Sequence, residues 1–286
     1  MLKTVAVIGV GLIGGSLSSG LREKRWCETV IGIDSDESAI ANALRLNVID
    51  QGYTSITDCD YVPDLVVIAV PVLKVGAVSE KIKTWFASAK AVTDVASTKQ
   101  KVINDVHHVF DAAIPNNFVP GHPIAGREQS GVQAATSNLF ENRRVILTPL
   151  ENTSVASSDL VKSMWQALGA NVETLTAEVH DKILAATSHL PHALAFSLVH
   201  CLASQSHTEE IFRYAAGGFA DFSRIASSDP VLWKEICLAN RSELLDAIVE
   251  FENCLKELRT GLENRDGEAL ERIFLNAKTT RDRFTQ

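Results

Sequence analysis

Residues 4–14 read TVAVIGVGLIG, an apolar β-rich run that ends in a glycine-rich turn. Gly9, Gly11 and Gly14 form the pattern G-x-G-x-x-G between this expected strand and a helix expected to run to about residue 25. In dinucleotide-binding domains the first glycine permits the tight turn, the second lets the backbone approach a pyrophosphate, and the third allows close packing of helix on sheet. The helix N-terminus then faces the phosphate charge. The stretch therefore predicts a Rossmann-type domain.

An acidic residue follows at the end of the next expected strand, residues 29–33. Asp34 stands 20 residues after Gly14, a spacing at which its carboxylate can accept hydrogen bonds from the adenosine ribose hydroxyls. Residues 34–37 contain three acids and no Arg or Lys, so they would repel a 2′-phosphate, and NAD is favoured over NADP. The alternative is a glycine turn of another α/β protein, with Asp34 as a helix cap. The predicted cofactor-binding residues are Gly9, Gly11, Leu12, Ile13, Gly14, Asp34, Val70 and Pro71.

The two halves of the chain differ in pattern. In the first half, short apolar runs alternate with helical segments, which predicts βαβ units and a doubly wound, mainly parallel sheet. From about residue 177, apolar residues recur at intervals of three and four, which predicts an all-α region. We expect a cofactor-binding domain at 1–176 and a helical domain at 177–286. Beyond those named above, the expected elements are strands at 64–70, 92–95 and 145–148 and helices at 37–46, 230–262 and 266–283.

Composition narrows the function classes. The 286 residues are 46% hydrophobic and carry a net charge of −8, so the chain can build a core and is poorly suited to bind nucleic acid. No apolar run reaches the ~18–20 residues that a membrane span needs. The five cysteines are scattered and never form C-x-x-C, which argues against a disulfide framework or a cysteine zinc site. We expect a cytoplasmic protein without a bound metal.

Two further stretches carry chemistry: residues 92–99, which follow an expected strand, and residues 121–131, which contain His122. Ligands of open α/β sheets bind outside the carboxyl ends of the strands, so a histidine there can face a cofactor. Oxidation of an alcohol by NAD requires a group that takes or orients the hydroxyl proton. A neutral imidazole, with an ordinary pKa of ~6.5, suits this role. A loop histidine without a catalytic role is the open alternative.

Five motifs occur in order along the chain: the glycine turn at 9–16, T-D-x-x-S at 93–97, G-H-P-I-A-G at 121–126, S-H-L-P-H at 188–192 and F-x-D-F-x-R-I-A-x-S-D-P at 219–230. In combination they resemble the prephenate dehydrogenases, with their arogenate and cyclohexadienyl relatives. The resemblance implies a Rossmann domain, a helical domain that forms a homodimer, and NAD-dependent oxidative decarboxylation of prephenate to 4-hydroxyphenylpyruvate in tyrosine biosynthesis.

The resemblance also implies roles for individual residues. His122 would contact the ring hydroxyl of the substrate and promote hydride transfer. Ser97 would hydrogen-bond near that hydroxyl and near His122. Arg224 would hold a substrate carboxylate. The remaining predicted substrate-binding residues are His180, His189, His192 and Glu128.

Several alternatives stay open. Arg224 could instead pair with Asp221 one helical turn away, and His189 with His192 could be a packed helix-start pair or, much less favoured, metal ligands. The substrate could be arogenate or both compounds. Another β-hydroxyacid dehydrogenase and a non-catalytic NAD-binding regulator are weaker rivals. The residues after about 262 are expected to supply only one more helix, too little for a regulatory amino-acid-binding domain. Tyrosine, if it inhibits, is therefore expected to compete at the active site.

Overall fold

The computed structural model describes residues 2–111, 113–127 and 129–284. The chain divides into two compact units, Met1–Asn240 and Arg241–Gln286, which are described separately. The residues of the candidate active site all belong to the first unit.

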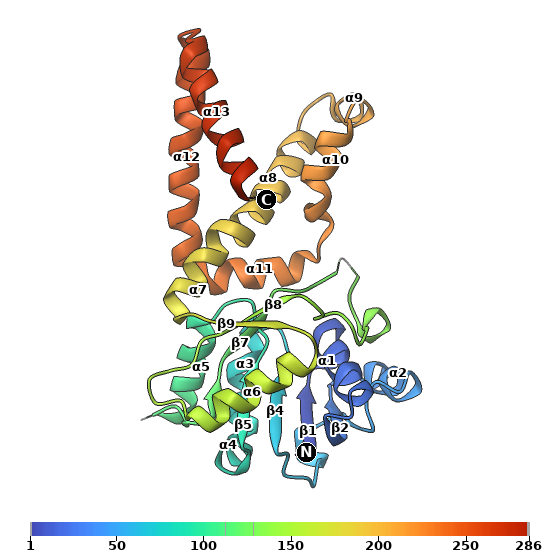
Figure 1. The fold of residues 1–286 in the computed structure, drawn as a ribbon. Coiled ribbons are helices and arrows are strands. Elements are labelled where there is room, and N and C mark those ends of the chain that lie inside the picture. Colours follow the sequence, from blue (N-terminus) through green and yellow to red (C-terminus); the bar gives the residue numbers. More distant parts are fainter. Residues whose placement is uncertain (1, 112, 128, 285–286) are drawn as a thin grey trace. The chain divides into compact units, whose positions relative to one another are not determined.

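The first unit contains a six-stranded, fully parallel sheet with the order β3-β2-β1-β4-β5-β6 (Figure 1). The chain runs outward from β1 to β3 and then returns to place β4 on the other side of β1. The boundary between β1 and β4 is therefore the topological switch point, where open α/β sheets bind their ligands. The strands are β1 (Leu2–Ile8), β2 (Cys27–Ile33), β3 (Gln51–Tyr53), β4 (Leu65–Ile68), β5 (Ala91–Asp94) and β6 (Phe118–Val119).

Helices cover both faces of this sheet, and the sequence of the central strands explains why. In β1, Val5 and Val7 belong to one buried cluster, whereas Ala6 and Ile8 belong to the other. A strand buried on both faces has no polar alternation, so it reads as one apolar run. One cluster packs α1 and α6 against the sheet and the other packs α3, α4 and α5. The helices are α1 (Leu12–Glu23), α2 (Glu37–Arg45), α3 (Val75–Lys81), α4 (Lys83–Ser88), α5 (Gln100–Phe110) and α6 (Val155–Ala167).

A second, three-stranded sheet contains β7 (Gly121–Pro123), β8 (Arg144–Leu147) and β9 (Asn171–Thr174). The strand expected at 145–148 belongs to this sheet, and not to the parallel one, because it pairs antiparallel with β7 and parallel with β9. β7 places His122 on a strand, opposite Ile146 of β8. Strands β3, β6 and β7 were not predicted, since two or three residues give too short a pattern. Strand β9 was also not predicted, because it is mostly exposed and contains a single apolar residue.

The chain after residue 176 is helical, as predicted. Thr176 caps α7 by accepting a hydrogen bond from the Val179 amide (3.3 Å), and Asp229 caps α11 through the Val231 amide (2.7 Å). A π-helical segment, Ala185–His189, interrupts the helices. The elements of the first unit here are α7 (Ala177–Leu184), α8 (Leu190–Ala203), α9 (Thr208–Arg213), α10 (Gly217–Ser223) and α11 (Pro230–Ala239).

The second unit is a pair of helices, α12 (Arg241–Glu263) and α13 (Gly267–Phe284). They pack closely where Gly261 of α12 meets Leu270 of α13: a Cβ at Gly261 would lie 3.0 Å from a Leu270 methyl carbon. None of the described helices in either unit combines the length and apolar character needed to cross a lipid bilayer.

Candidate active site

The turn after β1 can close only with glycine. Gly9 adopts a φ of +96°, and a Cβ there would lie 2.5 Å from the Ala69 carbonyl oxygen. A Cβ at Gly14 would lie 2.0 Å from the Gly9 oxygen. Gly11, by contrast, has no neighbour within 4 Å of its Cβ position among the described residues, so its backbone stands open to an approaching group. The turn thus has the close packing and the open approach that a pyrophosphate requires.

The start of α1 is suited to bind an anion. Its N-cap residue is Gly11, which offers no side chain to the first-turn amides, and the first turn contains no acidic residue. Those amides and the positive end of the helix dipole are available to a phosphate. Leu12 and Ile13 contribute their backbones here, while their side chains pack against the core beneath.

Asp34 lies directly after β2, next to this turn. One carboxylate oxygen accepts a hydrogen bond from the Val10 amide (2.8 Å), and the other accepts one from the Asp36 amide (3.0 Å). These bonds fix the carboxylate beside the glycine turn, and each oxygen keeps a free lone pair for a ribose hydroxyl. Val70 and Pro71 follow β4 across the switch point, and the Val70 nitrogen lies 3.0 Å from the Cβ position of Gly9. The predicted cofactor residues therefore line one edge of the sheet.

His122 lies beside a chain of buried polar groups. Its Nδ1 is 2.9 Å from Nε2 of His180, and Nδ1 of His180 is 2.7 Å from a carboxylate oxygen of Asp181. His180 is 0% exposed and His122 only 8%. The Asp181 carboxylate also accepts the amides of Lys99 (2.7 Å) and Gln100 (2.8 Å), where α5 begins. The first turn of α7 is therefore tied both to β7 and to the loop after β5.

A buried ion pair holds the start of β7. Lys99 and Asp94 are both fully buried and paired with each other. The Lys99 ammonium also donates to the Gly121 carbonyl, while Asp94 accepts from the Gly121 amide (3.2 Å). The residue that precedes His122 is thus held by two opposite charges, which restricts the position of the imidazole.

The surroundings of His122 favour its neutral form. Burial holds its pKa well below the ordinary 6.5, and the neighbouring charges of His180, Lys99 and His189 lower it further. Burial likewise lowers the pKa of Lys99, opposed by the Asp94 carboxylate. A neutral imidazole can accept a proton at neutral pH, which is what a general base must do.

Ser97, predicted as the second catalytic residue, lies partly buried between β5 and α5. Within the described ranges, its hydroxyl makes no hydrogen bond with His122. Ser97 follows Ala96, whose backbone amide donates a hydrogen bond to the Asp94 carboxylate (2.8 Å).

His189 lies in the π-helical segment, a feature often found at functional sites. The Asn240 amide group donates both to the Asp181 carbonyl (2.8 Å) and to Nδ1 of His189 (3.0 Å). Because a carbonyl can only accept, the amide nitrogen of Asn240 must face this way, so neutral His189 carries its proton on Nε2. Burial lowers the pKa of His189 to about 4.

His192 stacks on Trp233, with ring centroids 3.6 Å apart and an angle of 17° between the planes. Its Nδ1 donates to the Ser188 carbonyl (2.8 Å). Its pKa is lowered chiefly by burial and also by the Arg224 charge, so Arg224 lies within electrostatic reach of this stack. Arg224 is exposed, at the start of a 3-10 turn between α10 and α11. A flat aromatic wall beside a guanidinium is suited to a cyclic carboxylate.

Glu128 lies outside the described residues. In the described part of the chain, no three His, Cys, Asp or Glu side chains gather in a way that could hold a metal ion.

The polar partners Asp181, Asn240, Asp94 and Lys99 were not predicted as site residues. Asp181 and Asn240 each stand in a helical stretch, and a sequence cannot tell a buried acid or amide from an exposed one. The available signal was the stretch 92–99, which contains Asp94, in the T-D-x-x-S motif, and Lys99.

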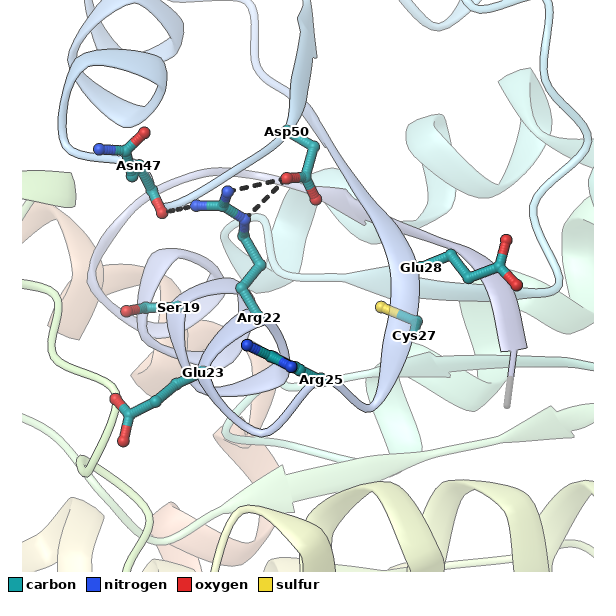
Figure 2. A pocket seen from close by; sticks show the side chains of 8 residues that line it. All are labelled: Ser19, Arg22, Glu23, Arg25, Cys27, Glu28, Asn47 and Asp50. Carbon is teal, nitrogen blue, oxygen red and sulfur yellow. Dashed lines mark hydrogen bonds and ion pairs between the residues drawn. The ribbon is translucent and has the colours of Figure 1, made fainter.

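A hollow elsewhere in this unit is not the cofactor site. Figure 2 shows it lined by charged and polar side chains, with the Arg22 guanidinium bound to the Asp50 carboxylate (2.8 Å) and the Asn47 carbonyl. It is formed by the end of α1, the start of β2 and the loop before β3. The glycine turn lies at the opposite, carboxyl edge of the sheet.

The parallel sheet, the glycine-lined anion site at its switch point and the buried neutral histidine define the class: a dinucleotide-dependent dehydrogenase. Residues 18–174 match the description "Prephenate dehydrogenase, nucleotide-binding domain", and residues 176–276 match "Prephenate dehydrogenase, dimerization domain". The chain belongs to the prephenate dehydrogenase family, which confirms the resemblance seen in the motifs.

Individual relatives are similar to this chain along nearly its whole length. Prephenate dehydrogenase of Bacillus subtilis is 38% identical over 99% of this chain and 76% of its own length. Cyclohexadienyl dehydrogenase of Zymomonas mobilis is 34% identical over 98% of this chain and 96% of its own. The crystal structure of prephenate dehydrogenase from Aquifex aeolicus, in complex with hydroxyphenyl propionate and NAD+, is 37% identical and superposes with a TM-score of 0.93 over 99% of both chains.

Proposed function

We propose that this protein catalyses the NAD-dependent oxidative decarboxylation of prephenate to 4-hydroxyphenylpyruvate. The observation that carries the proposal is His122, a buried neutral imidazole held through the backbone of the preceding residue, Gly121, and at its own Nδ1. The chain belongs to a family whose relatives include proteins named prephenate dehydrogenase and cyclohexadienyl dehydrogenase. The unit that contains His122 also contains the glycine turn proposed for the cofactor.

NAD, when bound, accepts the hydride from the carbinol carbon of the substrate ring. The chain has to control a proton during this step. His122 accepts the proton of the ring hydroxyl as the carbon is oxidised, the ring carboxylate leaves as CO₂, and the electrons of the broken C–C bond complete the aromatic ring. His122 then returns the proton to the phenol oxygen. A positioned base of this kind contributes a factor of ~10²–10⁴ to the rate.

The remaining predicted residues would bind the substrate. Arg224 would hold a carboxylate as a two-pronged donor, and the His192–Trp233 stack beside it would pack against the ring. His189 would offer its Nε2–H as a donor, and Ser97 would hydrogen-bond near the ring hydroxyl. Glu128 keeps its proposed role in recognising the substrate side chain.

Replacing Arg224 with alanine is expected to raise KM for prephenate by about 10–100-fold, since a hydrogen bond to a charged group is worth ~1.5–3 kcal/mol. Steady-state kinetics at saturating NAD would measure this. Arg143→Ala, which removes an exposed arginine before β8, is the matched control and should leave KM unchanged. An unchanged KM in Arg224→Ala would remove Arg224 from the substrate site.

NAD is the cofactor, and Asp34 is proposed to select it over NADP. Asp34→Ala is expected to lower kcat/KM for NAD by about tenfold, the loss of one charged hydrogen bond, and to improve NADP use, because the repulsion of the 2′-phosphate is removed. The ratio of the two kcat/KM values is the measurement, with Asp159→Ala, an exposed acid on α6, as control. An unchanged ratio would contradict the assignment of Asp34.

L-arogenate is the second candidate substrate, favoured by the relative named cyclohexadienyl dehydrogenase. The experiment that tests the proposed function follows NADH formation with prephenate and with L-arogenate separately. Turnover of prephenate supports the main proposal, and turnover of both makes the protein a dual-specificity enzyme. No turnover of either, with NAD still bound, would overturn the proposal.

We also propose a functional division into a cofactor-binding part, 1–176, and a helical part, 177–286, through which two chains form a homodimer. The match to a dimerization domain and the exposed apolar side chains of the helices support this. All five cysteines are free, which fits a reducing compartment, proposed to be the cytoplasm. Light scattering of the purified chain at the mass of a monomer would contradict the homodimer.

A further inference from the structure

The hydrogen bonds around His180 fix where each proton lies. An Asp181 carboxylate oxygen, 2.7 Å from Nδ1 of His180, also receives the Lys99 amide, so it is an acceptor. His180 must therefore carry a hydrogen on Nδ1, and its Nε2 in the neutral ring is an acceptor. His122, 2.9 Å away, must then donate from its own Nδ1.

This order of protons leaves Nε2 of His122 as an unprotonated lone pair. Within residues 2–111, 113–127 and 129–284, that nitrogen makes no hydrogen bond. The opposite tautomer would place the proton on Nε2 and leave two lone pairs facing each other between the rings. The His122 ring is thus held with its basic nitrogen turned away from His180.

We propose that Asp181 is a positioning residue that, through His180, sets the tautomer of His122 and stabilises its positive charge once it has accepted the substrate proton. This inference rests on the proposed function. It assigns His180 to the support of His122 instead of to direct contact with the substrate, because both of its ring nitrogens are already bonded within the protein and the residue is 0% exposed.

Other charged groups near His122 do not supply this effect. Lys99 faces it from the loop after β5 and, as a cation, disfavours a charged imidazole, although its own charge is paired with Asp94. A positive charge on His180 or on His189 would likewise disfavour a charged His122 imidazole. The Asp181 carboxylate is therefore the negative group that is linked to His122 by hydrogen bonds without being paired to a lysine.

The first test compares Asp181→Asn with the wild type. We expect kcat to fall by about 10–100-fold, as when the outer partner of a functional histidine is removed. The acid limb of kcat/KM against pH should also move to lower pH, because loss of the negative charge makes protonation of His122 harder. A purely structural role predicts the opposite direction, since loosened packing admits water and returns the pKa toward 6.5.

Asp64→Asn is the matched control. The Asp64 carboxylate also accepts two backbone amides, those of Lys3 (2.7 Å) and Thr4 (3.2 Å), but lies at the amino edge of the sheet. The Asp64→Asn variant should keep the wild-type kcat and the wild-type acid limb of kcat/KM against pH. An acid limb in Asp181→Asn that stays in place or moves to higher pH would overturn the proposal.

A second pair of variants carries the test if Asp181→Asn does not fold. His180→Gln keeps an oxygen that can accept from His122 and an amide that can donate to Asp181, whereas His180→Leu keeps neither. We expect His180→Gln to retain at least tenfold more kcat than His180→Leu. Equal losses would overturn the proposal.

The tautomer can also be observed without any turnover. Long-range ¹H–¹⁵N spectra of the wild type should show His122 protonated at Nδ1, and in His180→Leu the Nε2–H form should become populated. This readout separates the inference from the proposed function: a protein that did not turn over prephenate could still show the predicted tautomer. A wild-type His122 protonated at Nε2 would overturn the inference alone.

Discussion

Replacing His122 with asparagine is expected to lower kcat for prephenate by about 10²–10⁴-fold, the contribution of a general base. Asparagine can still donate a hydrogen bond to His180, but it cannot accept the substrate proton at neutral pH. The rate of NADH formation at steady state measures the loss of kcat. NAD binding, measured by the quenching of tryptophan fluorescence, should be retained. His107→Asn, an exposed histidine on α5, is the matched control and should keep the wild-type kcat.

The pH profile gives this prediction its sign. A base must be deprotonated to work, and the pKa of His122 lies well below 6.5 because the ring is buried. The kcat/KM of the wild type for prephenate should therefore stay constant as the pH falls through 6.5 and should decline only at lower pH. His122→Asn should lose this acid limb. A wild-type limb centred at or above 6.5, or a wild-type kcat in the variant, would exclude His122 as the base.

Replacing Lys99 with methionine is expected to lower the free energy of unfolding by about 3–5 kcal/mol, because it leaves the Asp94 carboxylate buried without its partner. Urea denaturation measures this change. The variant should also lose activity, since the Gly121 carbonyl beside His122 loses its donor.

The double variant Asp94→Asn with Lys99→Met separates charge from packing. It removes both charges and keeps a side-chain oxygen for the Ala96 amide, so it should recover part of the loss, with a coupling of about 0.5–3 kcal/mol. Lys101→Met, which removes a partly exposed lysine from the i,i+4 pair with Asp105, is the control and should cost less than about 1 kcal/mol. Strictly additive losses would show that the buried pair contributes no coupling.

The amino-acid sequence alone determined the glycine turn and Asp34, which we propose to bind the cofactor. Gly9, Gly14 and Asp34 lie within one βαβ unit, where local geometry dictates residue type: Gly9 needs a positive φ, and Gly14 has no room for a Cβ. The apolar runs of β1 and β4 predicted a sheet buried on both faces for the same reason, since burial of a strand leaves a pattern in consecutive residues. The helical second half was likewise readable from its three- and four-residue spacing.

The arrangement of side chains around His122 depended on the tertiary structure. His122 and His180 are 58 residues apart in the chain, and the Lys99 amide meets Asp181 across 82 residues. Such contacts arise only when β7, α5 and α7 pack together, and no local pattern encodes them. Resemblance to a family pointed to His122 as the catalytic residue and to His180 as a residue near the substrate or shaping its pocket. Only the packed structure pairs the two rings, buries Asp181 behind them and fixes which nitrogen of His122 is free to accept a proton.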